Sequence, residues 1–375
     1  MSSPRCGILS LMTSSLILVA AACVPAAASM DLASPAVFET QTVNLEVTPN
    51  PQGSFQAPQT PEPTSSPSLS PTHLIYPTLA PSATPPSPSP TPCVADQCSY
   101  SSQFFLHRPI ALPGNDEVDV TYRFGSTQGG LRDPHHGVEF LNSFGTPVLA
   151  AADGLVVVAG SDLQPTSPQG AWPITFYGPY SNFYGNLVVI EHRMPLALLE
   201  AFPEMPDKLY SLYGHLSEIS VEAGQQVRTG QELGRVGMSG IAEGSHLHFE
   251  VRLGENTYAN VRNPELWLIP HQDEDGQPLG ALAGSFIDSY GNNLFKDSIV
   301  LQHLPDGPDG ASDFQITIMS YEEDALIGQL PWQESFAVGD LPPGLYRVSF
   351  PHFGLREELV QVYPGTLTVA TFKLE

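Results

Sequence analysis

The most regular alternation of hydrophobic and polar positions in this chain lies at residues 244–252, which read GSHLHFEVR. Three apolar residues alternate with polar ones, and this period of two predicts a β-strand that is buried on one face. Because residues two apart in a strand point the same way, His246 and His248 leave the same face. Two parallel imidazoles on a rigid strand suit a metal site, in which one binds the ion and the other acts on water.

The middle of the chain is a series of short apolar runs separated by glycines and turn residues. Residues 146–151 and 155–159 flank an Asp-Gly pair and predict a β-hairpin. Residues 187–192 and 209–215 predict two further strands, and residues 196–201 predict a short helix. Since no long amphipathic helix is present, the pattern predicts an antiparallel β domain.

Five more strands are predicted in the C-terminal part of the chain, with turn residues between them. They cover residues 298–302, 314–320, 344–350, 359–362 and 366–374. This spacing is typical of a small β-sandwich. The predicted fold class is therefore all-β, with an antiparallel β domain at residues 99–270 followed by a small C-terminal β-sandwich at residues 271–375.

The N-terminus reads as an export signal at residues 1–22, with the positive charge of Arg5 before an apolar run. That run is too short to be a comfortable membrane-spanning helix. Cys23 follows three alanines and resembles the lipidated cysteine of bacterial lipoproteins, whereas cleavage near Ala28 is the alternative. Both interpretations place the protein outside the cytoplasm, either anchored to the membrane by a lipid at Cys23 or secreted to the cell envelope.

Residues 23–98 are dominated by proline, serine and threonine. Such a segment cannot bury a core, so it predicts a disordered linker that favours extended conformations. Cys93 and Cys98 lie at its end. Because the chain offers no second cysteine pair for a zinc site, we expect these two cysteines to form a disulfide rather than a metal or redox pair.

The chain is strongly acidic, with 39 Asp and Glu against 14 Lys and Arg and a net charge of −25. No run of basic residues is present. This balance argues against nucleic acid or anionic lipid as an electrostatic partner.

Three other motifs accompany the strand with the two histidines. Residues 135–140 read HHGVEF and are followed by GTPV, residues 209–216 read LYSLYGHL, and a glycine-rich run spans residues 224–244. Together these motifs resemble the lysostaphin/LytM family of zinc metalloendopeptidases, peptidase family M23, which cut peptide cross-links in bacterial cell walls. The resemblance covers roughly residues 120–265, with every motif in the order of that family.

The resemblance implies a role for five residues. His135, Glu139 and His248 would bind Zn²⁺, and His215 and His246 would be the catalytic pair. Two neutral imidazoles and one carboxylate leave an open position at the zinc, as a catalytic site requires. One unligated histidine can take a proton from water, and the other can stabilise the oxyanion or protonate the leaving amine.

The chain departs from the family pattern in two respects. The family's carboxylate is normally Asp, whereas this chain has Glu139. Two insertions also occur, at about residues 161–184 and 193–208. The first is rich in aromatic residues and forms either a wall of the substrate groove or a loop packed on itself. His136 and His192 are expected to have no direct role.

These inferences predict an exported, lipid-anchored zinc metalloendopeptidase that hydrolyses peptide cross-links of bacterial peptidoglycan. The alternative is a non-catalytic member of the same fold that binds the cell wall or activates another hydrolase, and Glu139 is its best support. A surface adhesin is a third class, against which the order of the histidines argues. Residues 336–348 resemble carboxypeptidase-regulatory-like or transthyretin-like accessory domains. The sequence leaves open the oligomeric state and the bond that is cut.

Overall fold

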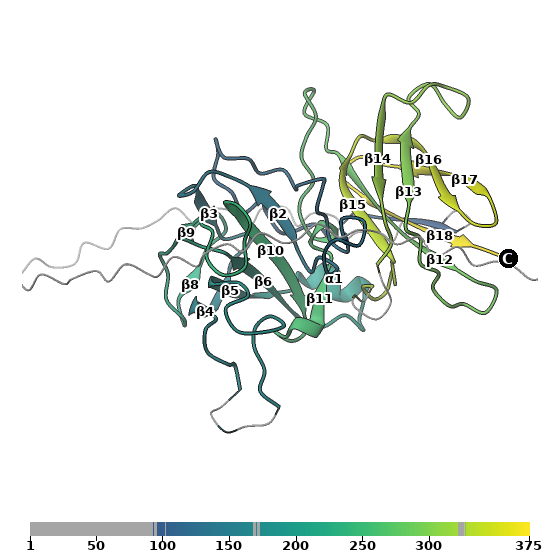
Figure 1. Cartoon of the computed structure of the whole chain (residues 1–375). Helices are drawn as coiled ribbons and strands as arrows, with labels where there is room; N and C mark the ends of the chain where they lie inside the picture. The colour runs from purple at the N-terminus through teal and green to yellow at the C-terminus, as the bar shows by residue number, and fades with distance from the viewer. Residues whose placement is uncertain are drawn as a thin grey trace, which may run out of the picture. The chain divides into compact units, whose positions relative to one another are not determined.

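All residues that the computed structural model describes belong to one compact unit (Figure 1). The described residues are 93, 96–101, 103–167, 170, 173–321, 326 and 328–375. The predicted export signal, Cys23 and most of the predicted linker lie outside these ranges. Within them, no helix is both long enough and apolar enough to span a membrane.

The largest sheet has seven strands in the order β11-β10-β6-β5-β4-β8, with β2 paired to β10 off this path. All its pairings are antiparallel, as predicted. Its members are β2 (Val138–Leu141), β4 (Gly154–Ser161), β5 (Asn186–Arg193), β6 (Lys208–Gly214), β8 (Gln226–Val227), β10 (His246–Leu253) and β11 (Val261–Arg262). The strand with the two histidines, β10, therefore lies inside the sheet, with neighbours on both edges (Figure 1).

Strand β10 is buried along its whole length, so the prediction of a half-buried strand was wrong. Its apolar residues pack into the main core, as expected. The opposite face is covered by the 161–184 insertion, from which the Tyr184 ring lies over His248 and the Tyr177 carbonyl accepts a hydrogen bond from Arg252. Alternation in the sequence cannot show that a distant insertion closes the polar face.

The prediction that residues 146–151 and 155–159 pair as a hairpin was also wrong. Both strands exist, but β3 (Pro147–Leu149) pairs with β9 (Glu232–Arg235) in a three-stranded sheet with β7 (Glu218–Ile219), whereas β4 pairs with β5 and β8. Strands β8 and β9 both lie in the glycine-rich run. This run therefore provides a partner for β4, which pairs with β8, and for β3, which pairs with β9. The predicted helix is confirmed as α1 (Leu196–Ala201).

The C-terminal part contains two four-stranded sheets, β1-β18-β12-β15 and β14-β13-β16-β17. Their members are β1 (Gln97–Tyr100), β12 (Gly280–Ile287), β13 (Ile299–His303), β14 (Phe314–Ile318), β15 (Phe336–Leu341), β16 (Gly344–Pro351), β17 (Leu355–Val362) and β18 (Leu367–Lys373). The two sheets enclose an apolar core that includes Phe286, Phe336 and Phe350. The all-β prediction is confirmed for the described residues, as are the five predicted strands.

Strands β12 and β15 in this part of the chain were not predicted, nor was β1, which joins the same sheet from residues 97–100. Along β12, Ala281 and Ala283 join the core of the seven-stranded sheet, whereas Leu282 and Phe286 join the sandwich core. A strand that is buried on both faces shows no alternation of apolar and polar residues. Cys98 lies on β1 and forms a disulfide with Cys93, as predicted.

Candidate metal centre

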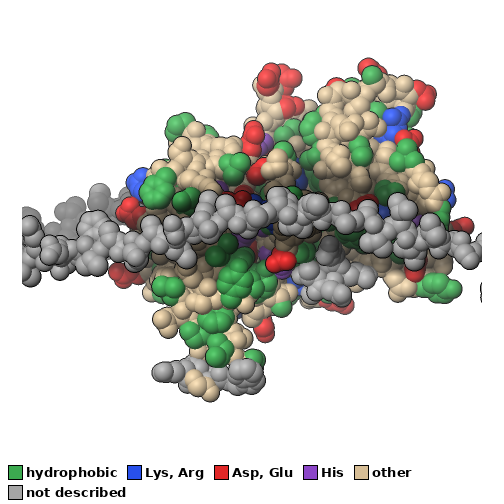
Figure 2. All heavy atoms as spheres, viewed as in Figure 1, with side chains coloured by type: hydrophobic (Ala, Val, Ile, Leu, Met, Phe, Trp, Pro, Cys, Tyr) green, Lys and Arg blue, Asp and Glu red, His purple; other side chains and the backbone are tan. Residues whose placement is uncertain are grey.

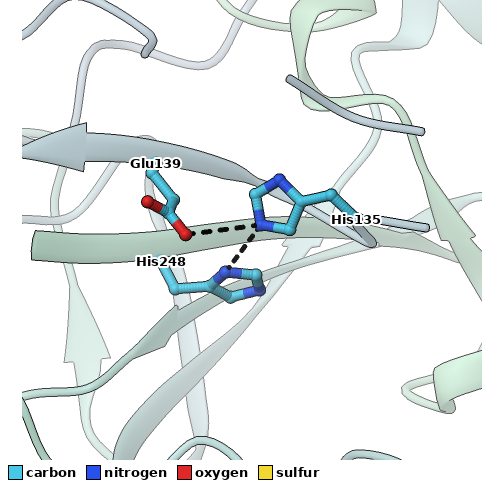
Figure 3. A group of neighbouring side chains, drawn as sticks. All are labelled: His135, Glu139 and His248. Atoms are coloured by element: carbon cyan, nitrogen blue, oxygen red, sulfur yellow. Dashed lines mark hydrogen bonds and ion pairs between the residues drawn. The ribbon is translucent and has the colours of Figure 1, made fainter. Parts of the chain in front are cut away.

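Three side chains converge where β2 and β10 pair. His135 precedes β2, Glu139 lies on β2, and His248 faces Glu139 directly in the antiparallel register. One ligand atom from each residue lies within 4.8 Å of the others (Figure 3). His135 Nε2 is 3.2 Å from His248 Nδ1 and 3.8 Å from Glu139 Oε1. Two motifs that lie far apart in the sequence thus meet at one point in the structure.

The second nitrogen of each imidazole is engaged by an acceptor. His135 Nδ1 lies 2.8 Å from the carbonyl oxygen of Tyr122, and His248 Nε2 lies 3.1 Å from Glu250 Oε1. Each of these nitrogens must carry the proton to make its hydrogen bond, so His135 Nε2 and His248 Nδ1 present lone pairs to each other. Two lone pairs and a carboxylate oxygen pointing at one space fit a cation.

Burial keeps the imidazole of His135 neutral. Burial, and then the nearby His248, hold the pKa of His135 well below its ordinary value. The Tyr122 ring stacks on His135 with the ring centroids 3.9 Å apart and the planes 7° from parallel. A neutral, immobilised imidazole is the form that binds a metal.

A buried network stands behind His248. The carboxylate of Glu250 accepts hydrogen bonds from Tyr184 Oη at 2.5 Å, from His248 Nε2 and from Arg252 Nη2 at 2.8 Å. Burial would raise the pKa of Glu250, but the ion pair with Arg252 and the hydrogen bonds outweigh it and lower this pKa to about 2. Such a carboxylate fixes the tautomer and orientation of a ligating histidine.

Sequence reasoning missed this network, although the signal was present. Residues 248, 250 and 252 are alternate positions of one strand and therefore share a face. The ion pair between Glu250 and Arg252 follows from that spacing. The contribution of Tyr184 could not be foreseen, because it depends on how the insertion folds over the sheet.

The two predicted catalytic histidines adjoin the ligand set. His215 follows β6 with a φ of 60°, a left-handed conformation that is uncommon outside glycine. Its ring centroid is 4.8 Å from that of His246 and 5.5 Å from that of His248. His246 Nε2 is buried, lies 3.5 Å from Glu139 Oε1 and has no hydrogen-bond partner among the described residues. All five predicted site residues therefore lie together.

Both of these rings are held through Nδ1. His215 Nδ1 donates to the carbonyl of Ser239 at 2.8 Å, and His246 Nδ1 donates to the carbonyl of Gly244 at 2.9 Å. Burial, reinforced by His248 and His246, lowers the pKa of His215 to about 3. Burial also lowers the pKa of His246, which Glu139 opposes. Each Nε2 consequently carries a lone pair that can accept a proton.

The two other histidines near these motifs contact residues outside the ligand group. His136 stacks on Tyr258 with a centroid separation of 4.1 Å. His192 Nε2 lies 2.7 Å from Ser211 Oγ, and its Nδ1 contacts the carbonyl of Asp153. Neither ring belongs to the ligand group.

One family model and several known proteins match the same middle region of this chain. Residues 133–260 match the model of Peptidase family M23. The chain is 33% identical over 118 residues to the peptidoglycan DD-endopeptidase ShyA of Vibrio cholerae, covering 32% of this chain and 20% of that protein. It is 29% identical over 136 residues to the murein hydrolase activator NlpD of Escherichia coli, covering 36% and 26%. The chain thus spans about a quarter or less of the length of these relatives.

Among solved structures, the chain is similar to a mutant of the catalytic domain of the M23 protein EnpA from Enterococcus faecalis. The identity is 25%, the match covers 42% of this chain and 95% of that one, and the TM-score is 0.30. The match over residues 133–260 includes all five predicted site residues. The chain therefore contains a domain of Peptidase family M23 at residues 133–260.

Proposed function

We propose that this protein is an exported zinc metalloendopeptidase that hydrolyses peptide cross-links of bacterial peptidoglycan. The observation that carries the proposal is the convergence of three ligand atoms beside two further histidines. ShyA, a relative over the same region, is a peptidoglycan DD-endopeptidase. In this proposal residues 99–270 form the peptidase domain and residues 271–375 the accessory β-sandwich.

The donor set fits zinc. His135 and His248 supply nitrogen and Glu139 supplies oxygen, which leaves room for a further ligand. A zinc ion held by these residues would supply Lewis acidity, which lowers the pKa of water and polarises a carbonyl. The carboxylate of Glu250 holds His248 in the tautomer that presents Nδ1 to the ion.

The two unligated histidines differ in their charged surroundings. Glu139, 3.5 Å from His246 Nε2, favours the charged form of His246, whereas His215 has two histidines beside it that disfavour its charge. We therefore assign proton acceptance from the attacking water to His246 and orientation of the reacting groups to His215. As the carbon–nitrogen bond of the peptide breaks, His246 returns the proton to the leaving amine.

The second candidate is an activator of another wall hydrolase. NlpD, a relative over the same region, is a murein hydrolase activator, and Glu139 replaces the usual Asp. A protein that only activates another hydrolase does not itself need a catalytic metal. Zinc content and hydrolysis therefore discriminate between the two candidates.

The proposed location is extracytoplasmic, with membrane attachment through a lipid at Cys23. Peptidoglycan peptides are the proposed partners. In Figure 2, Asp and Glu side chains outnumber Lys and Arg on the visible face, and the chain has a net charge of −25. An acidic surface of this kind does not suit nucleic acid.

The experiment compares wild type with two histidine variants. Purified protein should hold about one zinc per chain by elemental analysis. His248→Ala should lose the zinc, whereas His246→Ala should keep it and lose hydrolysis of cross-linked muropeptides. A wild-type protein that neither retains zinc nor takes it up on titration would overturn the proposal.

A further inference from the structure

The segment at residues 122–126 fixes both the ring and the backbone of the proposed metal ligand His135. The Tyr122 carbonyl accepts the hydrogen bond from His135 Nδ1, and the Tyr122 ring stacks on the imidazole. The amide of Gly125 donates to the His135 carbonyl at 2.8 Å, and the His135 amide donates to Ser126 at 3.1 Å. A shift of this segment would therefore displace His135 directly.

The same segment is fastened to the C-terminal sheets by a buried carboxylate. Glu265 lies in the short 3₁₀ helix η2 (Pro264–Leu266), and its Oε2 forms an ion pair with Arg123 Nη1. The same oxygen accepts a hydrogen bond at 2.8 Å from the amide of Gly339, which lies on β15. The side chain of Glu265 is 2% exposed and that of Arg123 is 12% exposed. One buried atom thus joins the segment that holds His135 to a strand of the C-terminal part.

A second contact lies beside this ion pair. The Phe124 ring packs edge-on against the Tyr321 ring, with centroids 5.1 Å apart. A Cβ atom at Gly125 would lie 2.8 Å from the Tyr321 ring, so the backbone approaches that ring closely. The Tyr321 hydroxyl accepts a hydrogen bond at 2.9 Å from Asn263 Nδ2, which also donates to the Ala337 carbonyl. Tyr321 is therefore fixed from both sides.

We propose that the C-terminal sheets position the metal ligand His135, and that Arg123 and Tyr321 are the positioning residues. The proposal rests on the proposed function for the identity of the metal. Both residues lie outside the 133–260 region that matches the peptidase family. In this proposal the C-terminal part helps to hold the metal site in place. It therefore does more than add an adhesion domain to the peptidase.

The test measures zinc affinity by competition with a chelator in the full exported chain. Arg123→Met and Tyr321→Ala should each weaken zinc binding by about tenfold, in the range for loss of groups that orient metal ligands. Arg123→Lys, which keeps the charge, and Tyr321→Phe, which keeps the ring, should retain most of the affinity. Arg193→Met is the matched control, because the ion pair of Arg193 with Asp207 is exposed.

A stability control separates positioning from general weakening of the fold. Val360→Ala opens a cavity in the sandwich core, away from the Arg123 and Tyr321 contacts, and should lower the midpoint of urea unfolding while leaving zinc affinity within about twofold. Unchanged affinity in Arg123→Met and Tyr321→Ala would overturn the proposal, as would an equal loss in Val360→Ala.

A readout without zinc keeps the proposal separate from the proposed function. Nitrogen-15 spectra of the zinc-free protein should place the His135 proton on Nδ1 in wild type and on a mixture of both nitrogens in Arg123→Met. If wild type binds no zinc, the proposed function fails while this comparison still tests the positioning. An unchanged His135 signature in both Arg123→Met and Tyr321→Ala would contradict it.

Discussion

At the scale of single residues, Glu139 is the most informative departure from the family pattern. One of its carboxylate oxygens lies 3.8 Å from His135 Nε2 and 3.5 Å from His246 Nε2. That oxygen therefore sits between a proposed ligand and the proposed base. An Asp side chain on the same β2 backbone would end one methylene short of this position.

We expect Glu139→Asp to keep zinc but to lower hydrolysis by about a hundredfold, since roughly an ångström of misplacement has that effect on a rate. Glu139→Ala should lose both zinc and activity. Zinc content and muropeptide hydrolysis are measured on each variant. Higher activity in Glu139→Asp would identify the wild type as a decayed enzyme, and activity indifferent to Glu139→Ala would mean that another carboxylate binds the metal.

The second prediction at the residue scale concerns Glu250. Glu250→Gln leaves the buried guanidinium of Arg252 without its carboxylate and weakens the acceptor of His248 Nε2. We expect unfolding free energy to fall by about 3–5 kcal/mol and zinc affinity to fall by about 10- to 100-fold. Urea unfolding and chelator competition measure these quantities. Glu191→Gln, at a more exposed ion pair with Lys208, serves as the control. Wild-type zinc affinity in Glu250→Gln would refute the orienting role.

At the scale of elements, the pairing of β2 with β10 brings the proposed ligands together, and Gly137 permits that pairing. A Cβ atom at Gly137 would lie 2.6 Å from the Phe249 carbonyl oxygen and 2.8 Å from His248 Cε1. The HxGxE spacing of His135, Gly137 and Glu139 therefore has a steric cause. Any side chain at this glycine would push the two strands apart where the metal should bind.

Gly137→Ala should lower the unfolding free energy by about 1–3 kcal/mol, as is usual for an overpacked core, and should abolish zinc binding. Gly244→Ala, near the other end of the site, is the matched control because nothing lies within 4 Å of a Cβ atom there. Thermal unfolding and zinc analysis compare the two variants. Normal zinc content in Gly137→Ala would show that the β2–β10 contact tolerates displacement.

Short-range patterns in the sequence predicted individual strands, but they did not predict which distant strands pair. Alternation located β10, and the resemblance to the family motif indicated the proposed ligands before and on β2. The partner of β3 was misassigned because β9 lies far along the chain, and pairing over such distances leaves no mark in a short window. Strand β12 was missed because small and apolar residues fill both of its faces. The contacts of Tyr184 depend on the fold of an insertion, which no residue pattern specifies.

At the scale of the whole described unit, charged side chains join its two parts at a second place. His271 lies between two carboxylates, with Nδ1 3.3 Å from Asp340 Oδ2 and Nε2 3.2 Å from Asp116 Oδ2. Arg108 also binds Asp340, at 2.7 Å. The hydrogen bond to Asp340 raises the pKa of His271 despite partial burial, and the pKa of Asp340 is lowered to about 2 despite its own burial.

This arrangement predicts a pH-dependent contribution to stability. Because the folded state raises the pKa of His271 above its ordinary value of 6.5, the contribution is fully present below that value and is lost as pH rises through the folded pKa. The difference in urea midpoint between wild type and His271→Gln should thus be larger at about pH 5.5 than at about pH 8.5. The exposed His107→Gln is the control. A difference that grows with pH would contradict this assignment.

The central claim is that the five residues around the β2–β10 pairing form a zinc peptidase. The most direct test is digestion of defined cross-linked muropeptides, with products identified by mass spectrometry, by zinc-loaded wild type, chelator-treated wild type and zinc-loaded His246→Ala. We predict cleavage of one type of peptide bond by the first protein, restored in the second by added zinc, and none by the third. Intact muropeptides after incubation with the zinc-loaded wild type, or equal cleavage by His246→Ala, would contradict the claim.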